Sequence, residues 1–164
     1  MIDQLDRFVG RISTSLAFLG AGLLGLLAVL IIVDIVGRQI GTPIRGTVEL
    51  AAMTVASATF LTIPYAMRQR GHIRSTIVVA RLPDGPRRTL EAFTYAIGAV
   101  TFAVLAVSSF DAMMTAFVAG SYEGEGALRV PTFPTRTIIF VSSIVMAVEC
   151  TLASLAVARR NNDE

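Results

Sequence analysis

The sequence contains no lysine and no tryptophan, and it has a single cysteine, Cys150, and a single histidine, His72. One thiol excludes a disulfide within the chain and leaves thiol–disulfide chemistry without a second sulfur. Haem bound between spanning helices requires histidines inside the apolar segments, whereas His72 lies in an arginine-rich segment. Two acids on one loop, Glu123 and Glu125, are too few to form a calcium cage. We therefore predict no cofactor, no metal site, no catalytic residue and no enzymatic activity.

Charged residues are also scarce, at 16% of the chain, and they are gathered into a few short interruptions. The apolar runs between these interruptions are too long for strands or for ordinary core helices. The pattern predicts an all-α integral membrane protein in which residues 1–164 form one domain with four transmembrane helices. We place the spans at residues 12–36, 47–67, 90–118 and 135–158. Residues 1–11 are expected to form an amphipathic turn or two in the membrane interface before the first span.

Arginine supplies all the basic charge, and six of the fourteen arginines lie between the second and third spans. Cytoplasmic loops are enriched in basic residues, so this loop, residues 68–89, is assigned to the cytoplasm. The assignment places ten arginines on the inner side and leaves four on the outer side, namely Arg38, Arg45, Arg129 and Arg136. Both termini are therefore predicted to be cytoplasmic, and residues 119–134 are predicted to form a periplasmic loop.

Within the basic loop, four apolar residues recur on one side of a helix, at Ile73, Ile77, Val78 and Leu82. This spacing predicts a short amphipathic helix that lies in the membrane interface. Arg74 and Arg81 lie beside the apolar face, where they either bind phosphates of anionic lipids or only anchor the topology. Nucleic-acid binding is not expected, because no aromatic residues alternate with the arginines.

Each predicted span carries one acid at or within its apolar stretch, and these acids are Asp34, Glu49, Asp111 and Glu149. A carboxylate inside a membrane is costly unless it is paired, protonated or in contact with water. Arg38 lies four residues from Asp34, and Arg45 lies four residues from Glu49, so a local ion pair or anchoring at the membrane interface is expected for each acid.

Asp111 and Glu149 have no basic residue within one helical turn. We expect each of them to make a polar contact with a neighbouring helix, either in this chain or in a partner. Nearby donors are available in the fourth span, at Ser142, Ser143, Thr151 and Ser154. The alternative interpretation of these two acids is a proton or cation relay.

Four short motifs stand at fixed places around these spans. They are Glu49-Leu50 at the start of the second span, Gly71-His72-Ile73 after it, Leu82-Pro83 before the third, and Leu128-Arg129-Val130-Pro131 before the fourth. With this four-span layout, the chain resembles the small permease (DctQ-type) subunit of tripartite ATP-independent periplasmic (TRAP) transporters. The resemblance covers nearly the whole chain.

The resemblance implies a multi-pass protein of the bacterial inner membrane that supports a large permease subunit. In that family, the large subunit holds the substrate and sodium sites, and a periplasmic binding protein delivers a carboxylate-type solute. The small subunit would enlarge the fixed scaffold and help to seat the binding protein. The residues expected to contact partners or lipids are Arg45, Glu49, His72, Arg74, Arg81, Asp111, Glu123, Glu125, Pro131 and Glu149. The alternative function is a small proton-coupled exporter that acts as a homo-oligomer through one membrane glutamate.

Overall fold

The computed structural model describes residues 2–69, 84–124 and 129–160. Within these ranges the chain forms four long helices, α1 (Ile2–Gln39), α2 (Thr47–Arg68), α4 (Asp84–Ala119) and α5 (Phe133–Arg160). Two strands of two residues each, β1 (Tyr122–Glu123) and β2 (Val130–Pro131), precede α5. The four helices are all long and apolar enough to cross a membrane, which confirms the predicted all-α architecture with four transmembrane-length helices. The predicted helix of the basic loop lies outside the described residues.

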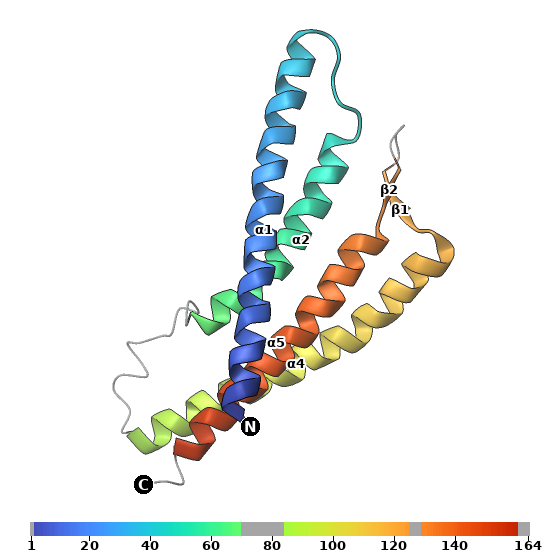
Figure 1. Ribbon diagram of the computed structural model, residues 1–164. Helices are drawn as coiled ribbons and strands as arrows, with labels where there is room; N and C mark the ends of the chain where they lie inside the picture. The colour runs from blue at the N-terminus through green and yellow to red at the C-terminus, as the bar shows by residue number, and fades with distance from the viewer. Residues whose placement is uncertain (1, 70–83, 125–128, 161–164) are drawn as a thin grey trace.

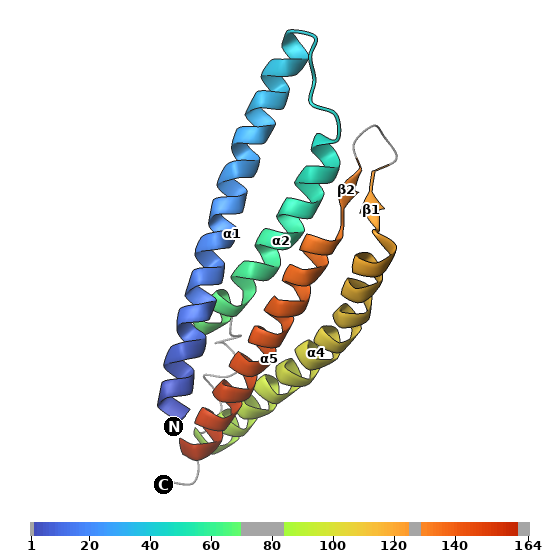
Figure 2. The ribbon, with the colours of Figure 1, turned by 45° about the vertical axis from the view of Figure 1, so that its right-hand side comes forward.

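The helices lie side by side in the order α1, α2, α5, α4, so they form a layer rather than a closed bundle (Figure 2). α2 and α5 occupy the middle of the layer and are more buried than α1 and α4, which flank them. Both termini lie at one end of the molecule, and the α1–α2 turn and the two strands lie at the other (Figure 1). We call these the terminal end and the hairpin end.

A glycine on α1 allows that helix to approach α2 closely. A Cβ atom added at Gly20 would lie 3.1 Å from the carbonyl oxygen of Ala58 and 3.2 Å from Cβ of Leu61. Ala58 and Leu61 are almost completely buried by this approach. Small residues serve this purpose in membranes, where helix association depends on close van der Waals packing rather than on exclusion of water.

α1 begins at Ile2 and runs without a break into the first predicted span, so residues 2–11 belong to the same helix as that span. No proline interrupts the sequence before Pro43, and nothing else in it ends the helix early. At about 1.5 Å per residue, a helix of 38 residues is longer than the hydrocarbon layer is thick, so its ends extend beyond that layer.

The α1–α2 turn, residues 40–46, is closed by Asp34. One carboxylate oxygen of Asp34 accepts a hydrogen bond from Nε of Arg38 at 2.8 Å, and the other accepts one from the backbone N–H of Ile44 at 2.8 Å. The predicted ion pair between Asp34 and Arg38 is therefore confirmed. The backbone N–H of Thr42 also donates to the carbonyl of Gly37 at 2.8 Å.

The predicted ion pair between Arg45 and Glu49 is wrong, because the ion pairs among the described residues do not include it. The expectation assumed that both residues lie on one helix. In the structure α2 begins at Thr47, and Gly46 before it has a φ of 78°, so the chain turns between the two side chains. Glu49 instead lies in the first turn of α2, where a carboxylate favours the helix N-terminus.

The strands β1 and β2 pair in antiparallel fashion, with Tyr122 opposite Pro131 and Glu123 opposite Val130. The guanidinium carbon of Arg129 lies 4.5 Å from the centre of the Tyr122 ring, which is a cation–π contact. The carbonyl of Ser121 accepts hydrogen bonds from the backbone N–H and the hydroxyl of Thr132, at 3.0 and 3.1 Å. The sequence analysis expected only a loop here, and two-residue strands give no period that a sequence pattern reveals.

Candidate functional site: a buried ion-pair network

Four polar side chains from three helices meet at the terminal end, and we call them the terminal-end network: Asp6, Ser13, Arg68 and Glu149. Glu149 Oε1 accepts a hydrogen bond from the Ser13 hydroxyl at 2.7 Å and another from Nε of Arg68 at 3.0 Å. Nη2 of the same guanidinium donates to Oδ1 and to the backbone carbonyl of Asp6, both at 2.6 Å. One arginine therefore joins two acids that lie on different helices.

The position of each network residue within its helix brings the four side chains together. Asp6 and Ser13 are seven residues apart on α1, which is two helical turns, so they lie on the same face. Arg68 is the last residue of α2 and Glu149 lies within α5. Gly10 lies between the two α1 members, and a Cβ added there would be 2.5 Å from Nη1 of Arg68. The guanidinium thus rests against the bare backbone of α1.

The burial of Ser13 and Glu149 indicates that the network has a structural role. Ser13 is fully buried and Glu149 is 5% exposed, whereas the Asp6 side chain is half exposed. A buried carboxylate is strongly unfavourable without a cation and hydrogen bonds, and here Arg68 and Ser13 provide both. The network therefore connects α1, α2 and α5 by satisfying a charge that none of these helices satisfies alone. No described hydrogen bond or ion pair links Glu149 to Asp111, so the described residues contain no relay between the two acids.

Sulfur-containing side chains pack beside the network. Met67, Met146 and Cys150 form a buried cluster next to Arg68 and Glu149 in sequence. The thiol of Cys150 lies 3.5 Å from the sulfur of Met67, and Gly98 of α4 leaves room for it, since an added Cβ would be 3.1 Å away. Cys150 is therefore a packing residue that helps α4 approach α5.

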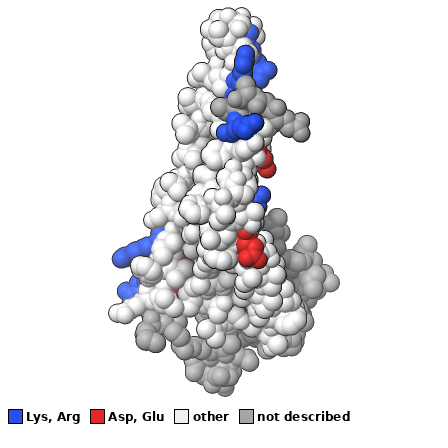
Figure 3. Space-filling view, turned by 90° about the vertical axis from the view of Figure 1, so that its right-hand side faces the viewer, with Lys and Arg blue, Asp and Glu red and all other residues white. Residues whose placement is uncertain are grey.

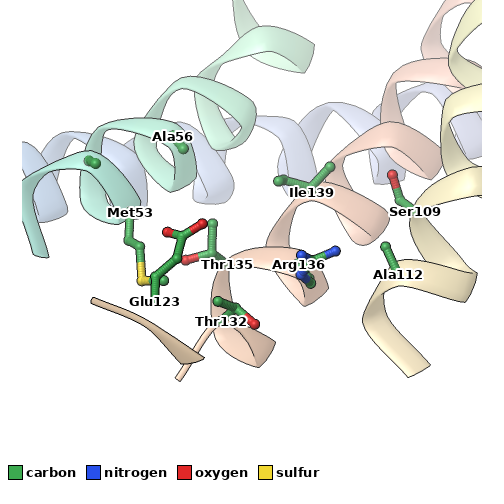
Figure 4. Close-up of a pocket in the computed structure, with 10 residues that line it drawn as sticks. Met53, Ala56, Ser109, Ala112, Glu123, Thr132, Thr135, Arg136 and Ile139 are labelled. Atoms are coloured by element: carbon green, nitrogen blue, oxygen red, sulfur yellow. The ribbon is translucent and has the colours of Figure 1, made fainter. Parts of the chain in front are cut away.

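A second feature is a groove of about 290 Å³ between α2 and α4, near the hairpin end. Its walls are Met53 and Ala56 of α2 and Ser109 and Ala112 of α4, and α5 forms its floor (Figure 4). Arg136 and Glu123 also line the groove, and the two do not form an ion pair. Among the described residues, no group of three or more histidine, cysteine, aspartate or glutamate side chains is placed to hold a metal ion.

The remaining predicted contact residues are dispersed. Asp111 is exposed on α4, and its carboxylate has no hydrogen bond or ion pair within the described part of the chain. Glu123 and Pro131 lie on the paired strands, and Glu49 and Arg45 lie near the α1–α2 turn. The other predicted residues, His72, Arg74, Arg81 and Glu125, lie outside the described residues or have no described side chain.

Glu149 does contact neighbouring helices of this chain, as expected, but its donors differ from the expected ones. Ser143, Thr151 and Ser154 donate to backbone carbonyls instead, and the Ser142 hydroxyl has no partner in the described chain. The sequence analysis missed the roles of Asp6, Ser13 and Arg68. A signal existed only for Arg68, which directly follows an apolar span, and nothing in the sequence connects it to an acid 81 residues away.

Four spanning-length helices, a surface that is mostly uncharged on the side seen in Figure 3, and a buried acid neutralised within the chain define a multi-pass membrane protein. Residues 27–160 match the family model described as "Tripartite ATP-independent periplasmic transporters, DctQ component". The match covers most of the chain, so the chain belongs to this family, the small permease component of TRAP transporters, and the resemblance found in the sequence is confirmed. The family is a transporter component and not an enzyme family. Comparisons with curated proteins and with solved structures found no match.

Proposed function

We propose that this small permease component is a static scaffold of a TRAP transporter in the bacterial inner membrane. It supports a large permease subunit in the sodium-coupled uptake of a carboxylate-type solute, which a periplasmic binding protein delivers. The observation that carries the proposal is the terminal-end network. The buried Glu149, the acid best placed for a membrane relay, is held by Arg68 and Ser13 in a structural contact.

The open layer of helices agrees with a scaffold. A transport path needs several polar groups that converge around a cavity or channel. Here the helices form a single layer, and the groove between α2 and α4 is lined mainly by small or apolar side chains. A layer of this kind leaves wide apolar faces for lipid and for a larger membrane protein.

The alternative, a proton-coupled exporter acting as a homo-oligomer, requires a membrane glutamate that binds and releases protons during transport. Glu149 is the only glutamate in the middle part of a described helix, and its carboxylate is engaged by Arg68 and Ser13 in a buried contact between helices. This disfavours the exporter.

The arginine distribution supports an orientation with the terminal end in the cytoplasm and the hairpin end in the periplasm. In this orientation the basic loop lies at the inner leaflet, where Arg74 and Arg81 of its amphipathic helix bind anionic lipid phosphates. Replacing both with glutamine lowers the amount of anionic lipid retained in native mass spectrometry. Unchanged lipid retention leaves them an anchoring role only.

The strands β1 and β2 then face the periplasm, and residues 120–133 border the docking surface of the binding protein. Deleting residues 123–126 in the presence of the large subunit tests this role. We expect uptake to fall most at low concentrations of binding protein, whereas unchanged uptake at every concentration refutes it.

Reconstitution tests the function as a whole. The chain is purified with a co-expressed large permease and placed in liposomes with the binding protein and a sodium gradient. We expect solute uptake only when both membrane subunits are present. The proposal is wrong if the chain alone supports solute-driven ion flux, or if it does not co-purify with the permease.

A further inference from the structure

One face of α4 carries a regular line of exposed side chains. Val100, Val104, Val107, Asp111, Met114 and Val118 recur at alternating spacings of four and three residues, and all six are exposed. We call this line the α4 seam, and the same spacing continues back along the helix to Leu90. Alternating spacings of three and four residues form the seam through which two helices pack side by side at a small angle.

The line beside the seam is suited to close approach. Thr94, Thr101, Ser108 and Thr115 recur every seven residues and are all exposed. Three of them, Thr94, Thr101 and Thr115, donate their hydroxyl hydrogen bonds to the backbone carbonyl four residues earlier in α4. They therefore present small side chains with no unsatisfied donor, which is the character of helix–helix interfaces in membranes.

Asp111 is the only charged residue of the seam, and it lies within α4, which ends eight residues later at Ala119. Phe117 contacts Phe133, the first residue of α5, with ring centres 5.1 Å apart, and Phe110 contacts Phe140 at 5.6 Å. Phe110 lies seven residues inward from Phe117, which is about 10 Å along the helix. Asp111, next to Phe110, therefore lies closer to the terminal end than the first residue of α5 does. Its carboxylate has no partner in the described chain. Lipid chains packed against this face would offer Asp111 no hydrogen-bond donor.

The exposed face of α1 has neither a charged residue within its apolar stretch nor a single line of exposed side chains. Between Arg11 and Asp34 the helix has no charged residue. Its exposed apolar side chains spread over most of the surface, including Phe18, Leu26 and Ile32, rather than following one line. Lipid chains satisfy such a face without a specific partner.

A second copy of this chain is a poor occupant for the α4 seam. Two copies in the same membrane have the same orientation, and a symmetric contact along the seam would place one Asp111 opposite the other. Like charges at facing positions of a helix pair are destabilising. The seam therefore fits a different helix, one that offers a donor at the height of Asp111.

We propose that the α4 seam is the surface that docks on the large permease, through a permease helix that places a basic or amide donor opposite Asp111. This inference rests on the proposed scaffold function. α1 then forms the lipid-facing edge of the scaffold. The polar position fixes the register of the two helices, as a single polar residue does in an apolar seam.

Photo-crosslinking in membranes that contain both subunits tests the docking face. A crosslinking phenylalanine analogue is placed at Val100 or Val107 of the seam and, as the matched control, at Phe18 or Ile32 of α1. We expect adducts with the large permease from the seam positions, at several times the yield from α1. Adducts with the permease mainly from α1, or adducts mainly between two copies of this chain at the seam, overturn the proposal.

Substitution of Asp111 gives a second measurement. Asp111→Leu is expected to lower the permease recovered with the chain about threefold to tenfold, as loss of an interhelical hydrogen bond in a membrane does. Asp111→Asn is expected to lower the recovery of the permease less than Asp111→Leu does. Phe18→Leu on α1 is the control. Thermal stability of the isolated chain should not fall, because Asp111 has no partner in the described chain. Unchanged recovery with Asp111→Leu refutes the docking face, whereas a wild-type chain that recovers no permease refutes the scaffold function itself.

Discussion

Arg68 shows how one side chain gives a membrane layer a defined shape. It is the last residue of α2, yet it contacts Asp6 near the start of α1 and Glu149 within α5. The long, planar guanidinium has enough donors to serve both acids at once, which a lysine does not offer in the same fork geometry. Its absence would leave Glu149 buried with only the hydroxyl of Ser13.

Removing the Arg68 cation should therefore lower the stability of the folded chain. We expect Arg68→Met to lower the free energy of unfolding in detergent by about 3 kcal/mol, the size typical of an uncompensated buried charge. The double variant Arg68→Met/Glu149→Gln should recover most of the loss, because no buried charge then remains. Arg45→Met is the control, since Arg45 is exposed and forms no ion pair within the described chain, and its loss should change stability little. An equal effect of the two single variants would contradict the role given to the network.

Gly10 allows a sharper comparison within one helix. A methyl group at Gly10 would collide with the guanidinium of Arg68, whereas nothing lies within 4 Å of the equivalent position at Gly22. Alanine is the better helix former by about 1 kcal/mol, so Gly22→Ala should leave stability unchanged or raise it. Gly10→Ala should lower it, because the steric shift breaks hydrogen bonds to Asp6 or Glu149. Thermal unfolding in detergent compares the two, and equal midpoints would show that the guanidinium moves aside freely.

At this scale the sequence predicts kinds of contact better than partners. The Asp34–Arg38 pair was predictable because both residues lie on one helix and helix geometry fixes their distance. The Arg45–Glu49 pair failed because Gly46 ends that regularity between them. Glu149 was recognised as an acid that needs a donor, but the donor comes from α2, and the packing of separate helices leaves no local signal in the sequence.

Among the helical elements, the α1–α2 hairpin depends on a single carboxylate at its turn. Asp34 is 5% exposed and accepts from Arg38 of its own helix and from the backbone of Ile44 across the turn. The turn also depends on Gly37, since a Cβ there would lie 2.5 Å from the carbonyl oxygen of Thr42. The hairpin end of α1 is thus fixed to the segment that leads into α2.

We expect Asp34→Ala to lower the free energy of unfolding, because the N–H of Ile44 loses its acceptor. Glu49→Ala, a nearby acid without an ion pair in the described chain, should have a smaller effect. Hydrogen exchange of the Ile44 amide gives the local measurement, and it should accelerate in Asp34→Ala only. Unchanged protection of that amide would show that the turn is held by other contacts.

At the scale of the whole molecule, the number of long helices followed from the apolar runs, but the full lengths of α1 and α4 and the arrangement of the helices did not. The layer order α1, α2, α5, α4 depends on which faces meet, and almost every face of these helices is apolar. Hydrophobic periodicity therefore loses the contrast that identifies a core face in a soluble protein. Close approach at Gly20 and Gly98 and the terminal-end network select the order instead.

The layer also gives the molecule two distinct ends, and the proposed orientation requires the terminal end to face the cytoplasm. Ile40 is exposed at the hairpin end and Gln69 is exposed at the terminal end, directly after α2. Cys150, the only native thiol, is 3% exposed, so it leaves little background for thiol labelling. In spheroplasts, an impermeant maleimide should label Ile40→Cys directly and Gln69→Cys only after the membrane is opened. Because positive charge is retained on the cytoplasmic side, replacing Arg87 and Arg88 with glutamine should weaken this asymmetry rather than reverse it. Direct labelling of Gln69→Cys in sealed spheroplasts would show that the orientation is the reverse of the proposed one. The strands β1 and β2 would then face the cytoplasm, where they could not dock the binding protein.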